Sequence, residues 1–470
     1  MPDSPTTADS NSGIKEPPTR LGGILRQLGP GLILAGSIVG SGELIATTRT
    51  GAEAGFSFLW LIILGCVIKV FTQIEVSRHC IISGTTTLSA LYHLPRVGKP
   101  IGWFWMITFL VGLGQLGGIV GGVGQALAIA GPFLGPNSPK IWAAIVAGIT
   151  IFMLIRGGFT FIEIFCTVLV ATFTLVTVGN VLLLQTKPDW AITAADLREG
   201  LSFGFPDHII AEDGTVKNPF ITALAAFGII GVGASEIVAY PYWCLEKGYG
   251  KWIGKNDQSE GWLSRAKGWI RVLQWDAWGS MVVYTVSTVA FYLLGAAVLH
   301  RARLIPEKSE MVATLAEMYE PAFGPVGRII LLVGAVAVLF STFFVSSAQK
   351  CRLMTDTLHV FNMRRMKSDA DRKRWIKIFS VVFPLLSLTI YLLFPRPALL
   401  VLFSGLMQSL LLPLLGIAAL YFRFKKIDPK LRPTRIWDAF LILSVIAFLA
   451  IGIYLMIDKG GALLNKITGG

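Results

Sequence analysis

Two short segments of the chain carry nearly the same arrangement of small residues followed by an acid. Positions 40–46 read GSGELIA and positions 233–239 read GASEIVA, 193 positions apart. Glycine and serine are poor helix formers and an acid is costly inside a membrane, yet both segments lie within apolar runs long enough to cross a bilayer. A matched pair of broken, charged spans is typical of a transporter's binding site.

The two acids, Glu43 and Glu236, predict a site for a hard cation. Breaking each helix frees backbone carbonyls around residues 38–40 and 231–234, which join the carboxylates as an all-oxygen set. Mg²⁺, Mn²⁺ and Ca²⁺ prefer such ligands, whereas soft metals prefer thiolate or thioether, and neither segment contains Met, Cys or His. The predicted binding residues are Gly40, Ser41, Glu43, Gly233, Ser235, Glu236 and Lys69, with Glu43, Glu236, Ser41 and Ser235 as metal ligands.

Helix capping is the alternative explanation of the two acids. Ser41 or Ser235 would then be the N-cap, with the acid in the first turn of the restarted helix. A first-turn acid gains about 0.3 to 1 kcal/mol, whereas an ionised acid at a helix centre in a membrane costs about 2.5 to 3.5 kcal/mol on insertion scales. Capping alone does not cover that cost, so binding is the favoured interpretation.

Lys69 lies about midway along the next apolar run. A lysine inside a membrane is either paired or functional by default, and its partner would be Glu43 or Glu236, for which it would supply an internal counter-charge. The equally weighted alternative is a lysine that snorkels to the inner surface. If Lys69 reaches the site, a divalent cation becomes less favoured and an anionic or zwitterionic solute more favoured.

Two glutamines of a third apolar run, Gln115 and Gln125, are ten residues apart and therefore lie on nearly the same helix face. They are candidates for lining a transport pathway. The more favoured interpretation is that they hydrogen-bond neighbouring helices.

The elements that position these residues are membrane-spanning helices. Of 470 residues, 53% are hydrophobic and only 15% are charged, with mean hydropathy +0.65, whereas soluble domains carry about 25% charged residues. Runs near or above the ~20 residues that cross a bilayer must be helices. We expect an all-α integral membrane protein with eleven such helices, over 28–54, 56–77, 101–132, 140–155, 159–184, 219–245, 272–299, 326–348, 376–394, 397–422 and 436–457.

The net charge of +13 follows the topology and does not indicate a nucleic-acid partner. With the N-terminus inside, the inner segments carry 28 Lys and Arg and the outer segments carry 11. This asymmetry follows the positive-inside rule. We therefore expect a multi-pass protein of the plasma or inner membrane, with a cytoplasmic N-terminus and the C-terminus outside; the partners are the lipid bilayer and a small ion or solute.

The two broken spans are the first and sixth, so five helices separate the start of the first from the start of the second, and the second unit enters the membrane from the opposite side. This predicts a 5+5 inverted repeat with discontinuous helices 1 and 6 facing each other and an eleventh helix appended. The expected parts are a disordered tail (1–20), the first repeat (21–184), an outer loop (185–217), the second repeat (218–422), and helix 11 with the C-terminus (423–470).

Several motifs resemble the Nramp (natural resistance-associated macrophage protein) family of proton-coupled divalent metal transporters. The GPG at 29–31, the GAEAGF at 51–56, Leu59-Trp60 and Gln73 are similar to the family's first two helices. The GIIG at 228–231 resembles the start of its sixth helix, and 404–413 resembles its tenth. The likeness is strongest over 28–85, and it implies a leucine-transporter-like fold.

The sequence departs from this family at the functional positions. The family's Asp-Pro-Gly-Asn aligns on positions 40–43, and its Met-Pro-His aligns on positions 235–237, so the thioether and the histidine are missing. The acids of its third helix fall on Gln115, Gly122 and Gln125, and the glutamine of its tenth helix falls on Leu411. The resemblance therefore implies a diverged branch without the family's rationale for Mn²⁺ or Fe²⁺ selectivity and for proton coupling.

These observations favour a secondary transporter that moves a divalent metal cation by alternating access. The alternative is a transporter of a small organic or anionic solute, with Lys69 and the half-helix N-termini facing the anion. A non-transporting sensor ranks third, because no soluble output domain is present. An enzyme is not expected, since no span carries a nucleophile–base pair and the five histidines lie at or beyond the span ends. No cofactor is expected beyond the transported ion.

Overall fold

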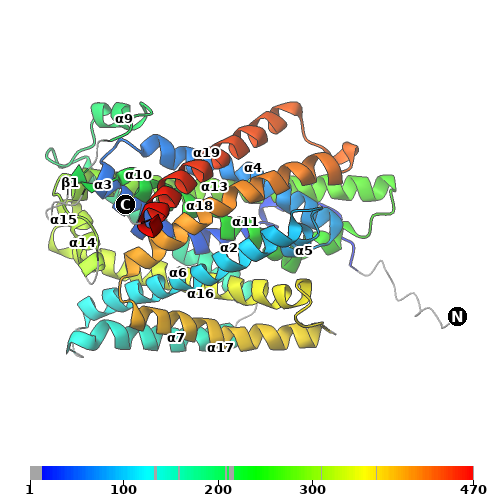
Figure 1. Ribbon diagram of the computed structural model, residues 1–470, viewed down its shortest axis with the longest axis horizontal. Helices are drawn as coiled ribbons and strands as arrows, with labels where there is room; N and C mark the ends of the chain where they lie inside the picture. The colour runs from blue at the N-terminus through cyan, green and yellow to red at the C-terminus, as the bar shows by residue number, and fades with distance from the viewer. Residues whose placement is uncertain are drawn as a thin grey trace.

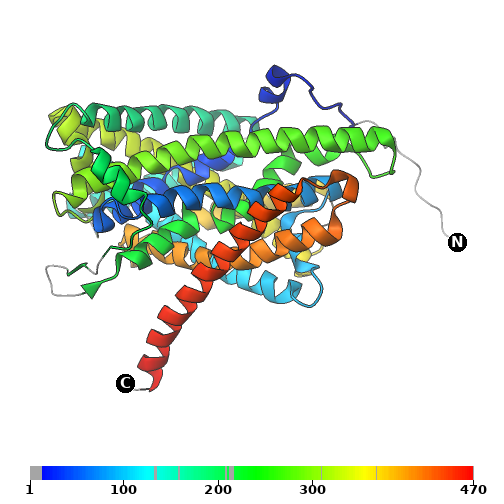
Figure 2. The ribbon, with the colours of Figure 1, turned by 90° about the horizontal axis from the view of Figure 1, so that it is seen from above.

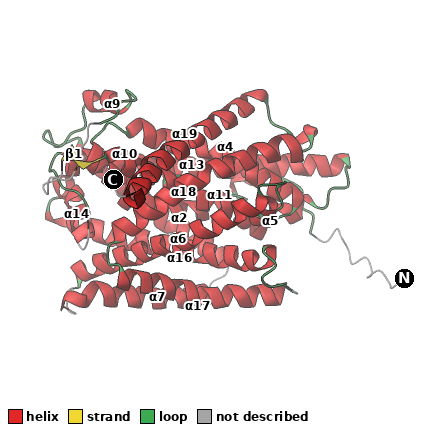
Figure 3. Ribbon diagram, in the orientation of Figure 1, coloured by secondary structure: helices red, strands yellow, loops and turns green. Residues whose placement is uncertain are grey.

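The protein is a helical bundle, as a computed structural model shows for residues 13–131, 135–156, 159–206, 209–210, 216–307, 310–366 and 368–468. Helices dominate these residues (Figure 3). The described residues also contain a short antiparallel ladder between β1 (Ile209–Ile210) and β2 (Val216–Lys217). The predicted all-α membrane architecture is confirmed.

The first half of the chain contains the first apolar spans and their connections. Its elements are α1 (Leu21–Leu25), α2 (Pro30–Ile38), the π-helical η1 (Ser41–Thr47), α3 (Thr48–Ala54), α4 (Leu59–Ser83), α5 (Thr87–Tyr92), α6 (Gly98–Ala130), η2 (Gly135–Asn137), α7 (Ser138–Arg156), α8 (Phe159–Leu184) and α9 (Ala194–Gly200).

The second half begins after the β1–β2 ladder. Its elements are α10 (Pro219–Ile229), α11 (Ala234–Lys247), α12 (Tyr249–Ile253), α13 (Glu260–Leu294), the π-helical η3 (Gly295–His300), α14 (Met311–Ala316), η5 (Glu317–Tyr319), α15 (Glu320–Phe323), α16 (Pro325–Val360), α17 (Asp369–Leu393), α18 (Pro397–Tyr421), η6 (Phe422–Lys426), η7 (Pro429–Leu431) and α19 (Arg435–Thr468).

Ten spans among the described residues are long and apolar enough to cross a membrane. They coincide with ten of the eleven predicted spans. The remaining predicted span, 159–184, corresponds to α8, in which Ala171–Leu184 forms a shorter apolar stretch. The count of eleven therefore stays a prediction.

The helices pack in layers around the two segments that carry the acids. At one edge α7 and α17 lie side by side, and α6 and α16 lie between this pair and α2 (Figure 1). The last helix, α19, packs on α4 and α18 and then runs obliquely away from the bundle (Figure 2). Small residues allow close helix contacts: a Cβ added at Gly228 of α10 would lie 2.0 Å from the carbonyl oxygen of Gly405 in α18.

The residues before Glu43 and Glu236 interrupt the regular helices. α2 ends at Ile38, and the π-helical η1 starts at Ser41. α10 ends at Ile229 and α11 starts at Ala234, with Gly231 between them at a φ of 54° that favours glycine. Gly40 and Gly233, rather than the predicted serines, hold the N-cap positions, and neither start has a side-chain cap.

The N-terminal segment was expected to be a disordered tail over 1–20. Residues 1–12 lie outside the described residues. From residue 13 the chain packs on the bundle: the carbonyl of Lys15 accepts a hydrogen bond of 2.9 Å from Trp269, and its Nζ lies 4.5 Å from the centre of the Trp252 ring.

Candidate functional site

The two interrupted segments touch at the centre of the bundle. A Cβ added at Gly42 of η1 would lie 3.1 Å from the carbonyl oxygen of Ile229, the last residue of α10. η1 also packs on α13, α18 and α16. The fold thus brings the Glu43 segment against the break that precedes Glu236.

Glu43 is fully buried in η1. Its Oε1 accepts a hydrogen bond of 2.9 Å from the hydroxyl of Thr288 in α13. Its Oε2 has no hydrogen-bond partner among the described residues. A buried carboxylate oxygen without a hydrogen-bond donor is costly, so this oxygen is available to accept a hydrogen bond or to bind a cation.

Glu236 lies in the first turn of α11 and is 9% exposed. The carboxylate of Glu236 lies over the break. A Cβ added at Gly233 would lie only 2.6 Å from Oε2 of Glu236. The same added Cβ would lie 3.1 Å from Oε1 of Gln408 in α18. Both acids thus lie at the interrupted segments, inside the bundle.

Gln115 of α6 connects the two breaks through a polar network. Its Nε2 donates to Ser41 at 3.1 Å, and its Oε1 accepts from Ser404 and from Gln408, both at 3.0 Å. Gln408 in turn accepts a hydrogen bond of 3.0 Å from the backbone N–H of Ser235. The structure therefore brings together Ser41, Ser235 and Gln115 of the predicted residues.

Gln125 lies apart from this network. It lines a separate cavity of about 260 Å³ beside the start of α7, with Ser138 and Pro139. A separation of ten positions spans about 15 Å of helix, so the two glutamines lie at different depths. That both glutamines line one pathway stays a prediction.

Lys69 of α4 is fully buried. Its Nζ donates to the carbonyl oxygens of Phe227 and of Ile230, the latter at 2.7 Å. Among the described residues, no carboxylate of Glu43 or Glu236 lies within ion-pair distance of it. Lys69 therefore lies at the end of α10 and does not snorkel to the surface, but its hydrogen-bond partners are backbone carbonyls and not the expected carboxylates.

Besides Ser404 and Gln408, three further residues of the site are not among the predicted ones. Thr288 holds Glu43, and Thr342 of α16 donates to the carbonyls of Gly36 and Val39, both at 3.1 Å, where α2 ends. Lys350 of α16 is 6% exposed, with its Nζ 4.9 Å from the centre of the Phe109 ring. Isolated threonines carry no distinctive sequence signal, whereas Lys350 follows directly on an apolar run and could have been found.

Both ends of the site are closed by protein. On one side α3 packs tightly on η3, and a Cβ added at Gly295 would lie 2.3 Å from the carbonyl oxygen of Thr48. On the other side Asp276 of α13 accepts from the backbone N–H groups of Gly29 and Gly31, at 2.8 and 2.6 Å, and from the hydroxyl of Tyr240 at 2.8 Å. Protein contacts therefore cover the site on these two sides.

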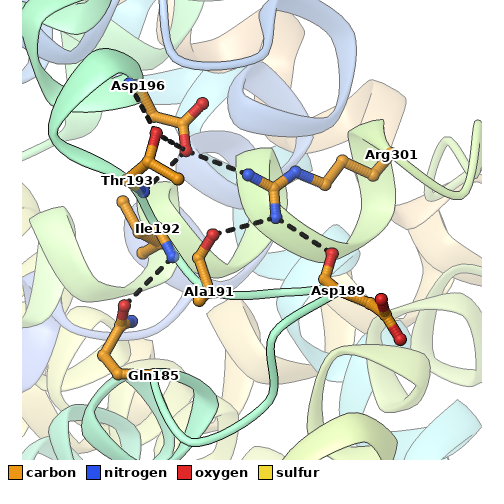
Figure 4. Close-up of polar contacts among 7 residues, drawn as sticks. All are labelled: Gln185, Asp189, Ala191, Ile192, Thr193, Asp196 and Arg301. Atoms are coloured by element: carbon orange, nitrogen blue, oxygen red, sulfur yellow. Dashed lines mark hydrogen bonds and ion pairs between the residues drawn. The ribbon is translucent and has the colours of Figure 1, made fainter.

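The connection between α8 and α10 covers the α3–η3 side. Arg301 donates to the carbonyls of Asp189 and Ala191 and forms an ion pair of 3.0 Å with Asp196 (Figure 4). This arginine lines a pocket of about 340 Å³ together with Glu53, Asp196, Glu199 and His300. Arg49 pairs with Glu53 at 2.7 Å, so two of the three acids have cationic partners.

The chemistry of the site is that of oxygen ligands. No group of three or more His, Cys, Asp and Glu side chains suited to a metal occurs in the part of the chain that the structure describes. A cation at the breaks would therefore combine the two carboxylates with hydroxyl and backbone carbonyl oxygens. This donor set fits Mg²⁺, Mn²⁺ or Ca²⁺ better than a soft metal.

The natural resistance-associated macrophage protein-like (Nramp) family model matches residues 31–458, which include both breaks. The chain belongs to the Nramp family. The expected family likeness is thus confirmed over most of the sequence.

Relatives within the Nramp family are distant. The divalent metal cation transporter MntH of Deinococcus radiodurans is 25% identical over 321 residues, which are 67% of this chain and 65% of that protein. MntH of Listeria welshimeri is 26% identical over 208 residues, 43% of this chain and 42% of that protein. The chain therefore matches less than two thirds of the length of either relative.

Solved structures share the fold. A crystal structure of the Eremococcus coleocola manganese transporter matches 98% of this chain and 95% of that one, with a TM-score of 0.63 and 16% identity. Mhp1, a nucleobase-cation-symport-1 family transporter, matches 92% of both chains with a TM-score of 0.56 and 15% identity. These likenesses confirm the predicted leucine-transporter-like fold class.

Proposed function

We propose that this Nramp-family chain is a secondary transporter that moves a divalent metal cation by alternating access. The observation that carries the proposal is Oε2 of Glu43, which is fully buried and has no hydrogen-bond partner among the described residues. A cation bound between the breaks would satisfy this oxygen. Family membership supports the same class of cargo.

We further propose that Glu43 and Glu236 bind the cation directly, with Ser41, Ser235 and carbonyls of the two breaks completing its shell. Ser41 is held by Gln115, and the backbone of Ser235 is held by Gln408. Positioned neighbours of this kind orient the atoms that bind a metal. The absence of a thioether in these segments favours Mg²⁺, Mn²⁺ or Ca²⁺ as the cargo.

The alternative cargo, a small organic or anionic solute, depends on Lys69 as the anion-facing group. The ammonium of Lys69 is instead directed at the carbonyls of Phe227 and Ile230. Because two backbone carbonyls already bind this ammonium, Lys69 is less available to an anion. The alternative is therefore the less supported of the two.

The setting of this activity is the membrane itself. We propose a multi-pass protein of the plasma or inner membrane, with the N-terminus in the cytoplasm and the C-terminus outside, because this orientation follows the distribution of Lys and Arg. Transport without covalent chemistry is the activity that this site supports.

Calorimetric titration of the purified protein in lipid nanodiscs with Mg²⁺, Mn²⁺ and Ca²⁺ tests the proposal. We expect saturable binding of at least one ion to the wild type, weakened at least about tenfold in Glu43→Gln, which corresponds to about 1.4 kcal/mol. Glu317→Gln, which removes a carboxylate from η5, is the matched control and should bind as the wild type does. No cation-dependent heat from the wild type would refute the proposal.

A further inference from the structure

The break after α10 leaves backbone carbonyls without their helical partners. α10 ends at Ile229, and the next helix starts at Ala234, so the last carbonyls of α10 cannot accept the usual hydrogen bonds from four residues ahead. Buried carbonyls without a donor are costly. The end of a helix also carries the negative pole of its dipole, which favours a cation.

Lys69 occupies this position. Its Nζ donates to the carbonyls of Phe227 and Ile230, the latter at 2.7 Å, and lies 4.5 Å from the centre of the Phe227 ring. These partners are two backbone oxygens and an aromatic face, all of which attract a monovalent cation. In discontinuous-helix transporters, unwound carbonyls and the C-terminal ends of half-helices are the groups that coordinate a mobile Na⁺ or H⁺.

Burial alone does not explain this geometry. Lys350 is also buried in the same bundle, at 6% exposure, but its Nζ lies against Gly112 and over the Phe109 ring. No carbonyl within the described residues accepts a hydrogen bond from Lys350, whereas Lys69 has two such acceptors. The carbonyl arrangement is therefore specific to the position of Lys69.

We propose that the Lys69 ammonium takes the place of a mobile monovalent cation at the end of α10. The protein then carries this cation on its own side chain, and neither its folded state nor its handling of cargo needs Na⁺ or K⁺. The claim about cargo rests on the proposed transport function, whereas the claim about the ammonium position does not. Removing the side chain should leave a site that a small free cation can fill.

Chemical rescue tests the proposal. Wild type, Lys69→Ala and Lys69→Met are purified in lipid nanodiscs, and thermal unfolding is followed while NH₄Cl, NaCl or KCl replaces choline chloride at constant ionic strength. Lys69→Ala should have a lower melting temperature than the wild type in choline and a saturable rise with NH₄⁺ or Na⁺. The wild type should show no saturable response.

Lys69→Met gives a second comparison. Methionine fills the space of the lysine without its charge, so this variant should be destabilised and should not respond to the small cations. A folded Lys69→Ala that ignores all three cations would overturn the proposal.

Binding of Na⁺ by the wild type is an independent test of the proposal. The wild type should bind no ²²Na⁺ in the same nanodiscs, and saturable binding or stabilisation by Na⁺ or K⁺ would overturn the proposal even if Lys69→Ala does not fold. None of these readouts uses a divalent metal, so a failure of the proposed cargo would leave the result interpretable.

Discussion

The hydroxyl of Thr288 lies 2.9 Å from Oε1 of Glu43 and 2.7 Å from the carbonyl oxygen of Tyr284, one turn earlier in α13. One hydroxyl proton is therefore shared between two acceptors, which fixes both the threonine rotamer and the direction of the carboxylate. As a result, Oε1 of Glu43 is held by protein, and Oε2 is the oxygen left for a ligand.

Replacing Thr288 by Val should weaken cation binding without unfolding the protein. The change removes the hydrogen bond that orients Glu43, and the loss of such a supporting group typically costs about 10- to 100-fold in metal affinity. Calorimetric titration measures the effect. Thr285→Val is the control, because Thr285 bonds Met281 of its own helix and not Glu43; equal losses in both variants would argue against an orienting role for Thr288.

Replacing Gly40 by Ala should destabilise the protein. A Cβ at this position would lie 1.9 Å from Oγ1 of Thr342, the group that bonds the carbonyls at the end of α2. Overpacking of this kind costs about 1 to 3 kcal/mol. The melting temperature should fall in Gly40→Ala, recover in part when Thr342→Ala is added, and stay unchanged in Gly148→Ala, since nothing lies within 4 Å of a Cβ there.

Replacing Gln115 by Leu should disrupt the network that joins the two breaks. Ser41, Ser404 and Gln408 would each lose a partner while remaining inside the bundle. Buried polar groups left unsatisfied cost about 1 to 3 kcal/mol each. We expect a lower melting temperature together with weaker cation binding. Gln125→Leu, which changes a glutamine outside this network, should leave cation binding intact.

Replacing Asp276 by Ala should open the side of the site near the start of α2. The N–H groups of Gly29 and Gly31 would lose their acceptor, and Tyr240 would lose its partner. Cys66, which is fully buried and lies next to Gly231, reports the opening in a variant whose other cysteines are replaced. Its labelling by a maleimide should be faster in Asp276→Ala than in the parent.

A labelling rate that stays at the parent's value while the protein remains folded would show that Asp276 does not hold this side closed. Ser280→Ala is the control for changes in α13, because Ser280 bonds only the carbonyl of Ala277 in its own helix among the described residues. It should label like the parent.

Much of the fold could be predicted from the sequence because the bilayer sets the length of each apolar run. The predicted spans overlap the observed helices, with differences where helices extend beyond the apolar core, as α16 does by continuing to Val360. That extension carries Lys350, which lies just beyond the predicted span 326–348, into the buried part of the bundle.

The sequence also predicted that Glu43 and Lys69 lie inside the membrane, since these charged residues stand out in apolar surroundings. The π-helical form of η1 could not be predicted, because π-helical turns are rare. In this segment the hydroxyls of Thr47 and Thr48 donate to the carbonyls of Gly42 and Glu43, five residues earlier, at 2.9 and 3.2 Å. The role of Thr288 depends on a contact between residues 245 positions apart, which no local pattern encodes.

An anomalous difference map from crystals grown with Mn²⁺ tests the central claim most directly. We predict a peak between the two breaks, in direct contact with Oε2 of Glu43 and with the Glu236 carboxylate, that is absent in Glu43→Gln. In the corresponding Mg²⁺ and Ca²⁺ structures the ligand distances should be about 2.0 to 2.1 Å and about 2.3 to 2.6 Å. A map with no peak at the breaks, or with the ion bound elsewhere and unaffected by Glu43→Gln, would contradict the proposed site.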